Sequence, residues 1–218
     1  MAIRIKVGVR PSPLSLAQVE EIKSKLGDIA LEVVTIKTKG DKDKITPLIL
    51  QENSDFFTYE IEQALIKREI DIAIYSAKDL EEKIPLELEI VAISESISPF
   101  DCLVSANRNS TLDTLRKMSS VGVSSKNRQK AIASYRSDLK IKSIRGDVDE
   151  RIKQLDSGDF DAIIVAHAAL IRLGLENRIS EIIPFDIIKP HPLQGKLAIQ
   201  SLRKRADLFK IFRGINEN

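Results

Sequence analysis

A lysine and an aspartate, Lys78 and Asp79, stand side by side directly after an apolar run at residues 70–76. The run predicts a strand that is buried on both faces, as in a parallel sheet. In open α/β sheets ligands bind just beyond the carboxyl ends of the strands, which is where this cation and anion would lie. The pair therefore indicates a site for a charged ligand. Two solvated loop charges would give the same pattern, so the other strand ends are needed to distinguish the two.

Four arginines occupy the same kind of position, at a strand exit or near a helix start: Arg10, Arg128, Arg145 and Arg151. Guanidinium groups bind carboxylates through charge-assisted, often bidentate hydrogen bonds. Ser12 followed by Pro13 predicts a helix N-cap. Ser124 and Ser125 precede a second helix start. The backbone N–H groups at a helix N-terminus can bind an anion. An ordinary turn before the first helix and a simple serine cap on the second would explain the same residues. Beside Asp79, the four arginines favour a functional site with an anion-binding wall.

Strands and helices alternate along the chain, which predicts α/β domains with largely parallel sheets. The strands are expected at residues 3–9, 31–36, 70–76, 88–93, 101–105, 120–123, 140–144, 161–166 and 197–201. The helices are expected at residues 13–26, 58–67, 112–118, 168–173 and 204–213, with two more that follow Ser125 and contain Arg151. The charged residues between 38 and 57 predict one long connection.

Two polar breaks, near residues 95 and 190, divide the pattern. They predict domain 1 at residues 1–95 plus 190–218 and domain 2 at residues 96–189. A cleft between the two domains would then be walled by the arginines and Asp79.

The composition excludes several classes of protein. With 34 Lys+Arg against 32 Asp+Glu, the net charge of +2 gives no case for nucleic-acid binding. The single cysteine, Cys102, excludes an internal disulfide and a thiolate-rich zinc site, and the two histidines are far from metal-ligand spacing. No signal-peptide pattern and no run of about 18 apolar residues occurs. We therefore expect a soluble, cytoplasmic monomer without a metal or a membrane partner.

Several short motifs follow one another over nearly the whole chain. They are Arg10-Pro11-Ser12-Pro13-Leu14-Ser15 with Gln18 one turn on, Thr38-Lys39-Gly40-Asp41, Tyr75-Ser76-Ala77-Lys78-Asp79-Leu80, Gly122-Val123-Ser124-Ser125-Lys126-Asn127-Arg128-Gln129, Arg145-Gly146-Asp147-Val148-Asp149-Glu150-Arg151, Gly158–Ala166 with Arg172-Leu173-Gly174, and Leu193-Gln194-Gly195. In this order they resemble the motifs R-x-S-P-L-A, T-x-G-D, H-S-x-K-D-V-P, G-T-S-S-L-R-R-Q, R-G-N-V-x-x-R, G-x-x-D-A-I-x-L-A with R-L-G, and G-Q-G. These belong to the hydroxymethylbilane synthase family, also called the porphobilinogen deaminases.

The resemblance implies an α/β fold of two type II periplasmic-binding-protein-like domains with a cleft between them. It implies the deaminating polymerisation of four porphobilinogen molecules into the linear tetrapyrrole hydroxymethylbilane, with a dipyrromethane cofactor as primer. Asp79 matches the catalytic carboxylate, which would stabilise positive charge on the pyrrole and take part in proton transfer. The residues that would bind substrate and cofactor carboxylates are Arg10, Ser12, Gln18, Lys78, Ser124, Ser125, Arg128, Arg145, Arg151 and Gln194.

The chain also departs from the family pattern. The sequence stops at Asn218, about where a third family domain with the cofactor-holding cysteine would begin, so we expect that domain to be absent. Cys102 matches no cofactor cysteine, and we expect it to be a buried thiol. The dipyrromethane would then not be attached through the usual cysteine. Asn127 stands where the family has one of two paired arginines, and Tyr59 replaces a lysine.

Three interpretations remain open. A two-domain deaminase would hold its primer without covalent attachment, or take the missing domain from another chain. A catalytically degenerate relative would bind a tetrapyrrole or a small carboxylate without turnover. An unrelated periplasmic type of ligand-binding protein would share only the architecture. The retained Asp79, Arg145 and Arg151 favour the first interpretation, and the specific motifs argue against the third.

Overall fold

The computed structural model describes residues 3–43, 46, 54–80 and 83–216, and the chain divides into two compact units. Unit 1 contains the described residues up to Asp43, those from 54 to Ile97 and those from Gly195 onward. Unit 2 contains the described residues from Ser98 to Gln194, with residue 46. The sequence places the crossings near residues 95 and 190, whereas these boundaries assign Gln194 to unit 2. Much of the predicted long connection, residues 44–45 and 47–53, lies outside the described residues.

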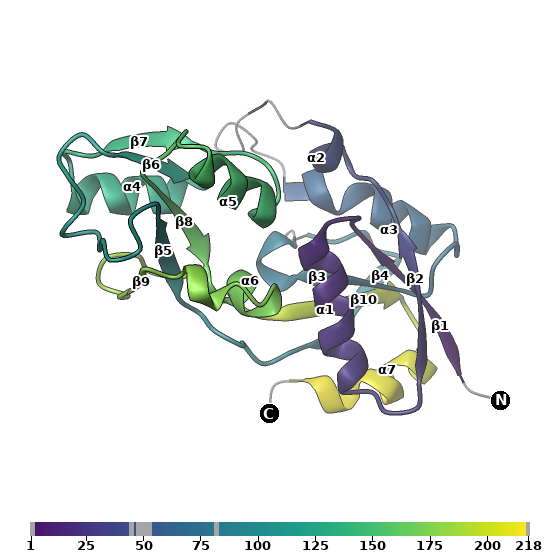
Figure 1. The fold of residues 1–218 in the computed structure, drawn as a ribbon. Coiled ribbons are helices and arrows are strands. Elements are labelled where there is room, and N and C mark those ends of the chain that lie inside the picture. The colour runs from purple at the N-terminus through teal and green to yellow at the C-terminus, as the bar shows by residue number, and fades with distance from the viewer. Residues whose placement is uncertain (1–2, 44–45, 47–53, 81–82, 217–218) are drawn as a thin grey trace. The chain divides into compact units, whose positions relative to one another are not determined.

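The described residues of unit 1 form a five-stranded sheet in the order β2-β1-β3-β10-β4 (Figure 1). Its strands are β1 (Arg4–Val9), β2 (Ala30–Thr35), β3 (Ile72–Ser76), β4 (Leu88–Ile93) and β10 (Leu197–Leu202). β1 pairs in parallel with β2 and β3, and β10 runs antiparallel to β3 and β4. The strand that leads to Lys78 and Asp79, β3, is therefore the central strand of its sheet.

Unit 2 repeats this topology with a sheet in the order β7-β6-β8-β5-β9 within its described residues. Its strands are β5 (Asp101–Ser105), β6 (Ser120–Val123), β7 (Lys140–Ser143), β8 (Ala162–Ala166) and β9 (Glu181–Ile183). β6 is parallel to β7 and β8, while β5 is antiparallel to β8 and β9. In both units the reversed strand, β5 or β10, is the first after a crossing. Each sheet is therefore mixed rather than purely parallel.

Helices cover both faces of the unit 1 sheet. α1 (Pro13–Ser24) and α7 (Ala206–Phe212) share one apolar cluster with the sheet, and α3 (Tyr59–Ile66) shares another. Along β3, Ile72 and Ile74 belong to the first cluster, whereas Ala73 and Tyr75 belong to the second. Successive side chains of a strand point to opposite faces, and all four are at most 5% exposed. The prediction of a strand buried on both faces is thus confirmed.

In unit 2 the helices are α4 (Lys126–Tyr135), α5 (Val148–Asp156) and α6 (His167–Arg172). The helix predicted at residues 112–118 is not formed, and turns take its place. Leu112 and Leu115 are nevertheless buried, so their apolar spacing reflects a packed turn, which closes at Met118 with a φ of 65°. Within the described residues, no helix of the chain is long and apolar enough to cross a membrane.

Candidate active site

Asp79 lies on a short turn at the carboxyl end of β3. The turn is the 3-10 helix η3 (Ala77–Asp79), which starts directly after Ser76. Two hydrogen bonds fix its backbone, from the Ala77 N–H to the Lys196 carbonyl oxygen (3.0 Å) and from the Leu80 N–H to the Ala77 carbonyl oxygen (3.3 Å). The Asp79 side chain is exposed and forms no hydrogen bond or ion pair with any described residue. A rigid backbone therefore presents this carboxylate to solvent.

Two of the predicted binding residues, Gln18 and Ser12, lie in α1 and at its N-cap. The Gln18 side chain is 3% exposed, and its Nε2 donates to Ser76 Oγ (2.8 Å) at the end of β3. Ser12 is the N-cap of α1, as predicted, and its Oγ accepts a hydrogen bond from the Ser15 N–H (3.2 Å). In this structure Gln18 links α1 to the end of β3, whereas Ser12 caps the start of α1. Their predicted contacts with a ligand stay a prediction.

Arg10, at the exit of β1, is held by a carboxylate. Its Nε and Nη2 both donate to Asp41 Oδ1, the former at 2.9 Å. The other oxygen of Asp41 accepts hydrogen bonds from the N–H and the Oγ1 of Thr38, both at 2.9 Å. Burial raises the pKa of Asp41, but the hydrogen bonds from Arg10 and Thr38 outweigh this effect and leave the pKa below its ordinary value. The motif Thr38–Asp41 thus fixes the orientation of Arg10.

The glycine of this motif has a steric role. Thr38 caps the short helix α2 (Lys39–Lys42), where the sequence analysis expects a loop. Gly40 in this helix lies against the ring of Phe57, and a Cβ at Gly40 would be 2.0 Å from that ring. The same ring lies under the Arg10 guanidinium, whose Cζ is 4.4 Å from the ring centroid. Gly40 is therefore required for the aromatic support of Arg10.

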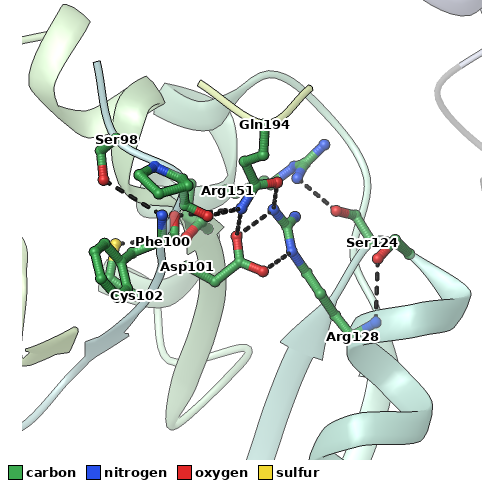
Figure 2. Close-up of polar contacts among 11 residues, drawn as sticks. Ser98, Phe100, Asp101, Cys102, Ser124, Arg128, Arg151 and Gln194 are labelled. Atoms are coloured by element: carbon green, nitrogen blue, oxygen red, sulfur yellow. Dashed lines mark hydrogen bonds and ion pairs between the residues drawn. The ribbon is translucent and has the colours of Figure 1, made fainter. Parts of the chain in front are cut away.

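In unit 2, Arg128 forms a buried ion pair that the sequence analysis does not anticipate (Figure 2). Its Nε donates to Asp101 Oδ2 (2.8 Å) and its Nη2 to Asp101 Oδ1 (2.6 Å), and the two residues are 9% and 5% exposed. Gln194 joins the pair through Nε2, which donates to Asp101 Oδ1 (2.7 Å). The available signal was an aspartate at the first position of an otherwise apolar strand, because such a charge requires a partner when it is buried.

One edge of the Arg128 guanidinium remains for another acceptor. Nε and Nη2 are used by Asp101, and Nη2 also donates to Gln194 Oε1 (3.4 Å). Nη1 forms no hydrogen bond with any described residue, and the side chain keeps 11% of its surface exposed. Since a guanidinium carries five N–H donors, Arg128 can keep its internal carboxylate and still donate to a second one.

The remaining unit 2 candidates lie on or beside the segments that lead into α4 and α5. Arg151 Nη1 donates to Ser124 Oγ (2.8 Å), and its Nε donates to the carbonyl oxygen of Gly146 (2.8 Å). Ser125, the N-cap of α4, accepts the backbone N–H of Arg128 at 3.3 Å. The structure therefore places two hydrogen-bonded sets around the start of α4, Ser124 with Arg151 and Arg128 with Ser125 and Gln194 (Figure 2). Arg145 lies directly before Gly146, and its carbonyl oxygen accepts a hydrogen bond from Gln154 Nε2 at 2.9 Å.

Comparison with known proteins identifies the family. Residues 5–210 match the family model "Porphobilinogen deaminase, dipyromethane cofactor binding domain". The chain is also 34% identical over 217 residues to the porphobilinogen deaminase of Legionella pneumophila (strain Paris), covering 98% of this chain and 70% of that protein. This chain belongs to the porphobilinogen deaminase family. Its members are transferases of tetrapyrrole synthesis, and the chain spans about seven tenths of the length of this relative.

Solved structures show the fold alone. A VFT2 domain of Bordetella pertussis BvgS matches with a TM-score of 0.51 at 14% identity, over 96% of this chain and 84% of that one. A regulatory domain of OxyR2 from Vibrio vulnificus matches with a TM-score of 0.51 at 15% identity, over 98% and 93%. The deaminase chain thus has the predicted fold of two α/β domains of the periplasmic-binding-protein-like kind.

Cys102 does not have the properties of a cofactor attachment site. The residue has no exposed surface, and its Sγ contacts the Val165 carbonyl oxygen at 3.4 Å. Burial and, to a lesser extent, the nearby Asp101 raise the pKa of the thiol to about 12, although Arg128 offsets part of the rise. The nucleophilic thiolate is therefore strongly disfavoured at neutral pH. The prediction of a buried thiol is confirmed.

The donors of unit 2 fit the dipyrromethane cofactor of the family. The acetate and propionate groups of a dipyrromethane require cationic or N–H donors. Arg128 Nη1 and the backbone N–H groups at the start of α4, a helix of ten residues, are donors of this kind. Ser124 and Arg151 lie beside them. The group around the start of α4 therefore has the chemistry to hold such a carboxylate-bearing group.

Proposed function

We propose that this chain performs the deaminating polymerisation of porphobilinogen, joining four pyrrole units head to tail into hydroxymethylbilane with the loss of ammonia. Membership of the porphobilinogen deaminase family supports this reaction. The observation that carries the proposal is the Asp79 carboxylate, which is exposed on a fixed turn and has no partner among the described residues. This carboxylate also lies at the carboxyl end of the central strand of its sheet, which is where ligands of α/β sheets bind.

Asp79 acts on the positive charge that develops during deamination. When the bond from the aminomethyl carbon to the leaving ammonia breaks, positive charge spreads over the pyrrole ring. A carboxylate oxygen of Asp79 that accepts the pyrrole N–H stabilises this charge, and it can carry a proton to or from the amine. Lys78, next to it, binds a substrate carboxylate as a point charge. The turn after β3 thus combines charge stabilisation with substrate orientation.

The arginines bind the acetate and propionate groups of the pyrroles. In this proposal Arg10 acts from unit 1, and Arg128, Arg145 and Arg151 act from unit 2. Asp41 and Asp101 hold the guanidinium planes of Arg10 and Arg128 in place before a ligand arrives. A preoriented cation loses little conformational entropy on binding, which improves the net free energy of each contact.

A dipyrromethane, when bound, supplies the free pyrrole position to which the first substrate unit is joined. We propose that Ser124, Ser125, Arg128 and Arg151 bind its carboxylates and that Cys102 does not attach it. Each charge-assisted hydrogen bond contributes about 1.5–3 kcal/mol, so several of them can hold a primer reversibly. Intact mass spectrometry tests this part: the purified chain should keep its sequence mass, and a gain of two pyrrole units on Cys102 would contradict it.

The reaction is tested by incubating the purified chain with porphobilinogen. One sample also receives preuroporphyrinogen, the product of the reaction, as a source of primer, and the other does not. We expect ammonia release and, after oxidation, uroporphyrin. Asp79→Asn should lower the rate at least about 100-fold, because the charge stabilisation is lost. The matched control is Asp28→Asn, since Asp28 is also exposed in unit 1 and forms no ion pair with a described residue. No product under either condition would refute the proposal, as would equal rates for the two variants.

A further inference from the structure

Unit 1 carries a hollow that is separate in the fold from the turn at Asp79. It has a volume of about 500 Å³ and lies where β4 meets the chain between β10 and α7. Its lining residues are Glu89, Arg203, Lys204, Arg205, Ala206, Phe209 and Lys210. The volume falls within the range of about 300–1,000 Å³ that is usual for small-molecule sites. None of these residues takes part in the proposed reaction.

Hydrogen bonds to neighbouring strands and side chains fix the backbone around this hollow. The Arg203 N–H donates to the Glu87 carbonyl oxygen (2.8 Å), and the Lys204 N–H donates to Glu89 Oε1 (2.9 Å). Lys204 has a φ of 67°, a left-handed conformation that is uncommon for a residue other than glycine. Such a conformation persists where the surroundings determine it, so the cations of this segment are displayed from a defined loop.

The charges of the hollow are strongly unbalanced. Arg205 is neutralised by Asp207, which accepts hydrogen bonds from its Nε (2.9 Å) and Nη2 (2.8 Å). The side chains of Arg203, Lys204 and Lys210, in contrast, form no ion pair or hydrogen bond with any described residue. Glu89 is the single acidic residue of the lining. Cations gathered in a concave site raise the local concentration of anions.

An aromatic ring lies among these cations. Phe209 projects from α7 with 49% of its surface exposed, although α7 buries Leu208 and Phe212 in the core of unit 1. Its neighbour Ala206 is also exposed and adds a small apolar surface. An exposed ring offers a flat apolar face to a second ring. The hollow therefore combines unpaired cations with a place for an aromatic group.

We propose that this hollow binds a planar aromatic compound with two or more anionic groups. Arg203, Lys204 and Lys210 pair with the anionic groups, and Phe209 packs against the ring. Two kinds of compound share this chemistry, namely pyrrole polycarboxylates and nucleoside polyphosphates. The site is independent of the proposed reaction, because its residues are not used in it.

Isothermal titration calorimetry of the full chain at low ionic strength tests the proposal with three probes: uroporphyrin, ATP and inorganic pyrophosphate. Lys210→Glu and Phe209→Ala change exposed side chains and should leave the fold intact. Lys67→Glu is the matched control, because Lys67 is an exposed lysine of unit 1 outside the hollow. We expect saturable binding of uroporphyrin or of ATP. Which of the two binds shows whether the ligand is a pyrrole polycarboxylate or a nucleoside polyphosphate. Each of the first two variants should weaken it at least fivefold, and the control should not.

Other results would overturn the proposal. Binding of uroporphyrin or ATP that Lys210→Glu and Phe209→Ala leave unchanged would place the ligand elsewhere on the chain. Pyrophosphate binding as tight as that of ATP and insensitive to Phe209→Ala would exclude the aromatic component. Absence of saturable binding of all three probes up to about 1 mM would exclude the site, because millimolar affinity corresponds to only about 4 kcal/mol. An inactive chain that still binds at the hollow would contradict the proposed function alone.

Discussion

Removing the charge of Asp101 should destabilise the protein by about 3–5 kcal/mol, the usual cost of breaking a buried ion pair. In Asp101→Asn the Arg128 guanidinium loses the one carboxylate to which it donates among the described residues, and its side chain is only 11% exposed. The amide of the new asparagine also cannot accept at both positions, and the 2.7 Å hydrogen bond from Gln194 Nε2 is weakened. We expect a value near 3 kcal/mol, because one carbonyl acceptor remains.

The measurement is urea denaturation followed by circular dichroism, together with thermal melting. Chains of 150–250 residues lose about 2–4 °C in Tm per kcal/mol, so a loss of about 3 kcal/mol predicts a decrease of about 6–12 °C. The matched control is Asp156→Asn in the same unit, where Asp156 pairs with Arg178 but is 53% exposed. Exposed pairs contribute at most about 1 kcal/mol, so the control should change the midpoint little.

A double-mutant cycle separates the ion pair from its surroundings. Arg128→Met leaves the Asp101 carboxylate buried, whereas Asp101→Asn with Arg128→Met removes both charges. Because an uncompensated buried charge is the main cost, the double variant should be more stable than the sum of the two single effects by at least about 2 kcal/mol. If Asp101→Asn costs less than about 1 kcal/mol, or if the two effects are additive, the reasoning about this pair is wrong.

Three further predictions follow from particular contacts. Gly40→Ala should lower the free energy of unfolding by more than about 1 kcal/mol in urea denaturation, because its Cβ would lie 2.0 Å from the Phe57 ring. The control Gly214→Ala should not lower it, because a Cβ there would have no atom within 4 Å. The pKa of Cys102 in the folded chain is about 12, above the ordinary 9.0, so its contribution to the free energy of unfolding is complete below pH 9 and is lost as the pH rises toward 12. A Cys102→Ala variant whose stability falls equally above pH 9 would contradict this. Tyr75→Phe should be neutral or stabilising by up to about 1 kcal/mol in thermal melting, because the buried Tyr75 hydroxyl has no hydrogen-bond partner among the described residues; a lowered Tm would show that it has one.

Local sequence patterns predicted the parts of the site that depend on neighbours in the chain. The apolar run before Lys78 identified β3 and the turn at its end, because periodicity and burial are encoded within a few residues. The Ser12–Pro13 dipeptide identified the start of α1 for the same reason. The helix predicted from Leu112 and Leu115 was wrong, since apolar spacing alone does not distinguish a short helix from a packed turn.

Contacts between distant residues were not predictable in this way. Arg128 and Asp101 are 27 residues apart, and Arg10 and Asp41 are 31 apart. The sequence indicated that each arginine binds a carboxylate but not that the carboxylate belongs to the protein. A charge at the first position of an apolar strand was the one local sign of Asp101, and its partner depended on which strands became neighbours.

These two internal carboxylates change what the arginines can contribute to binding. Asp101 fixes the guanidinium plane of Arg128 and lowers the cost of burying its charge, but it also cancels most of that charge. Arg128 therefore acts on a ligand mainly as a directed N–H donor, through Nη1, and less as a source of electrostatic potential. A lysine has no second edge with which to hold Asp101 and a ligand at once, so Arg128→Lys is not a conservative change. If several pairs of this kind line the binding surface, affinity must come from the number and geometry of directed hydrogen bonds. Binding of carboxylates there should then depend only weakly on salt, in contrast to binding at the unpaired cations around Phe209.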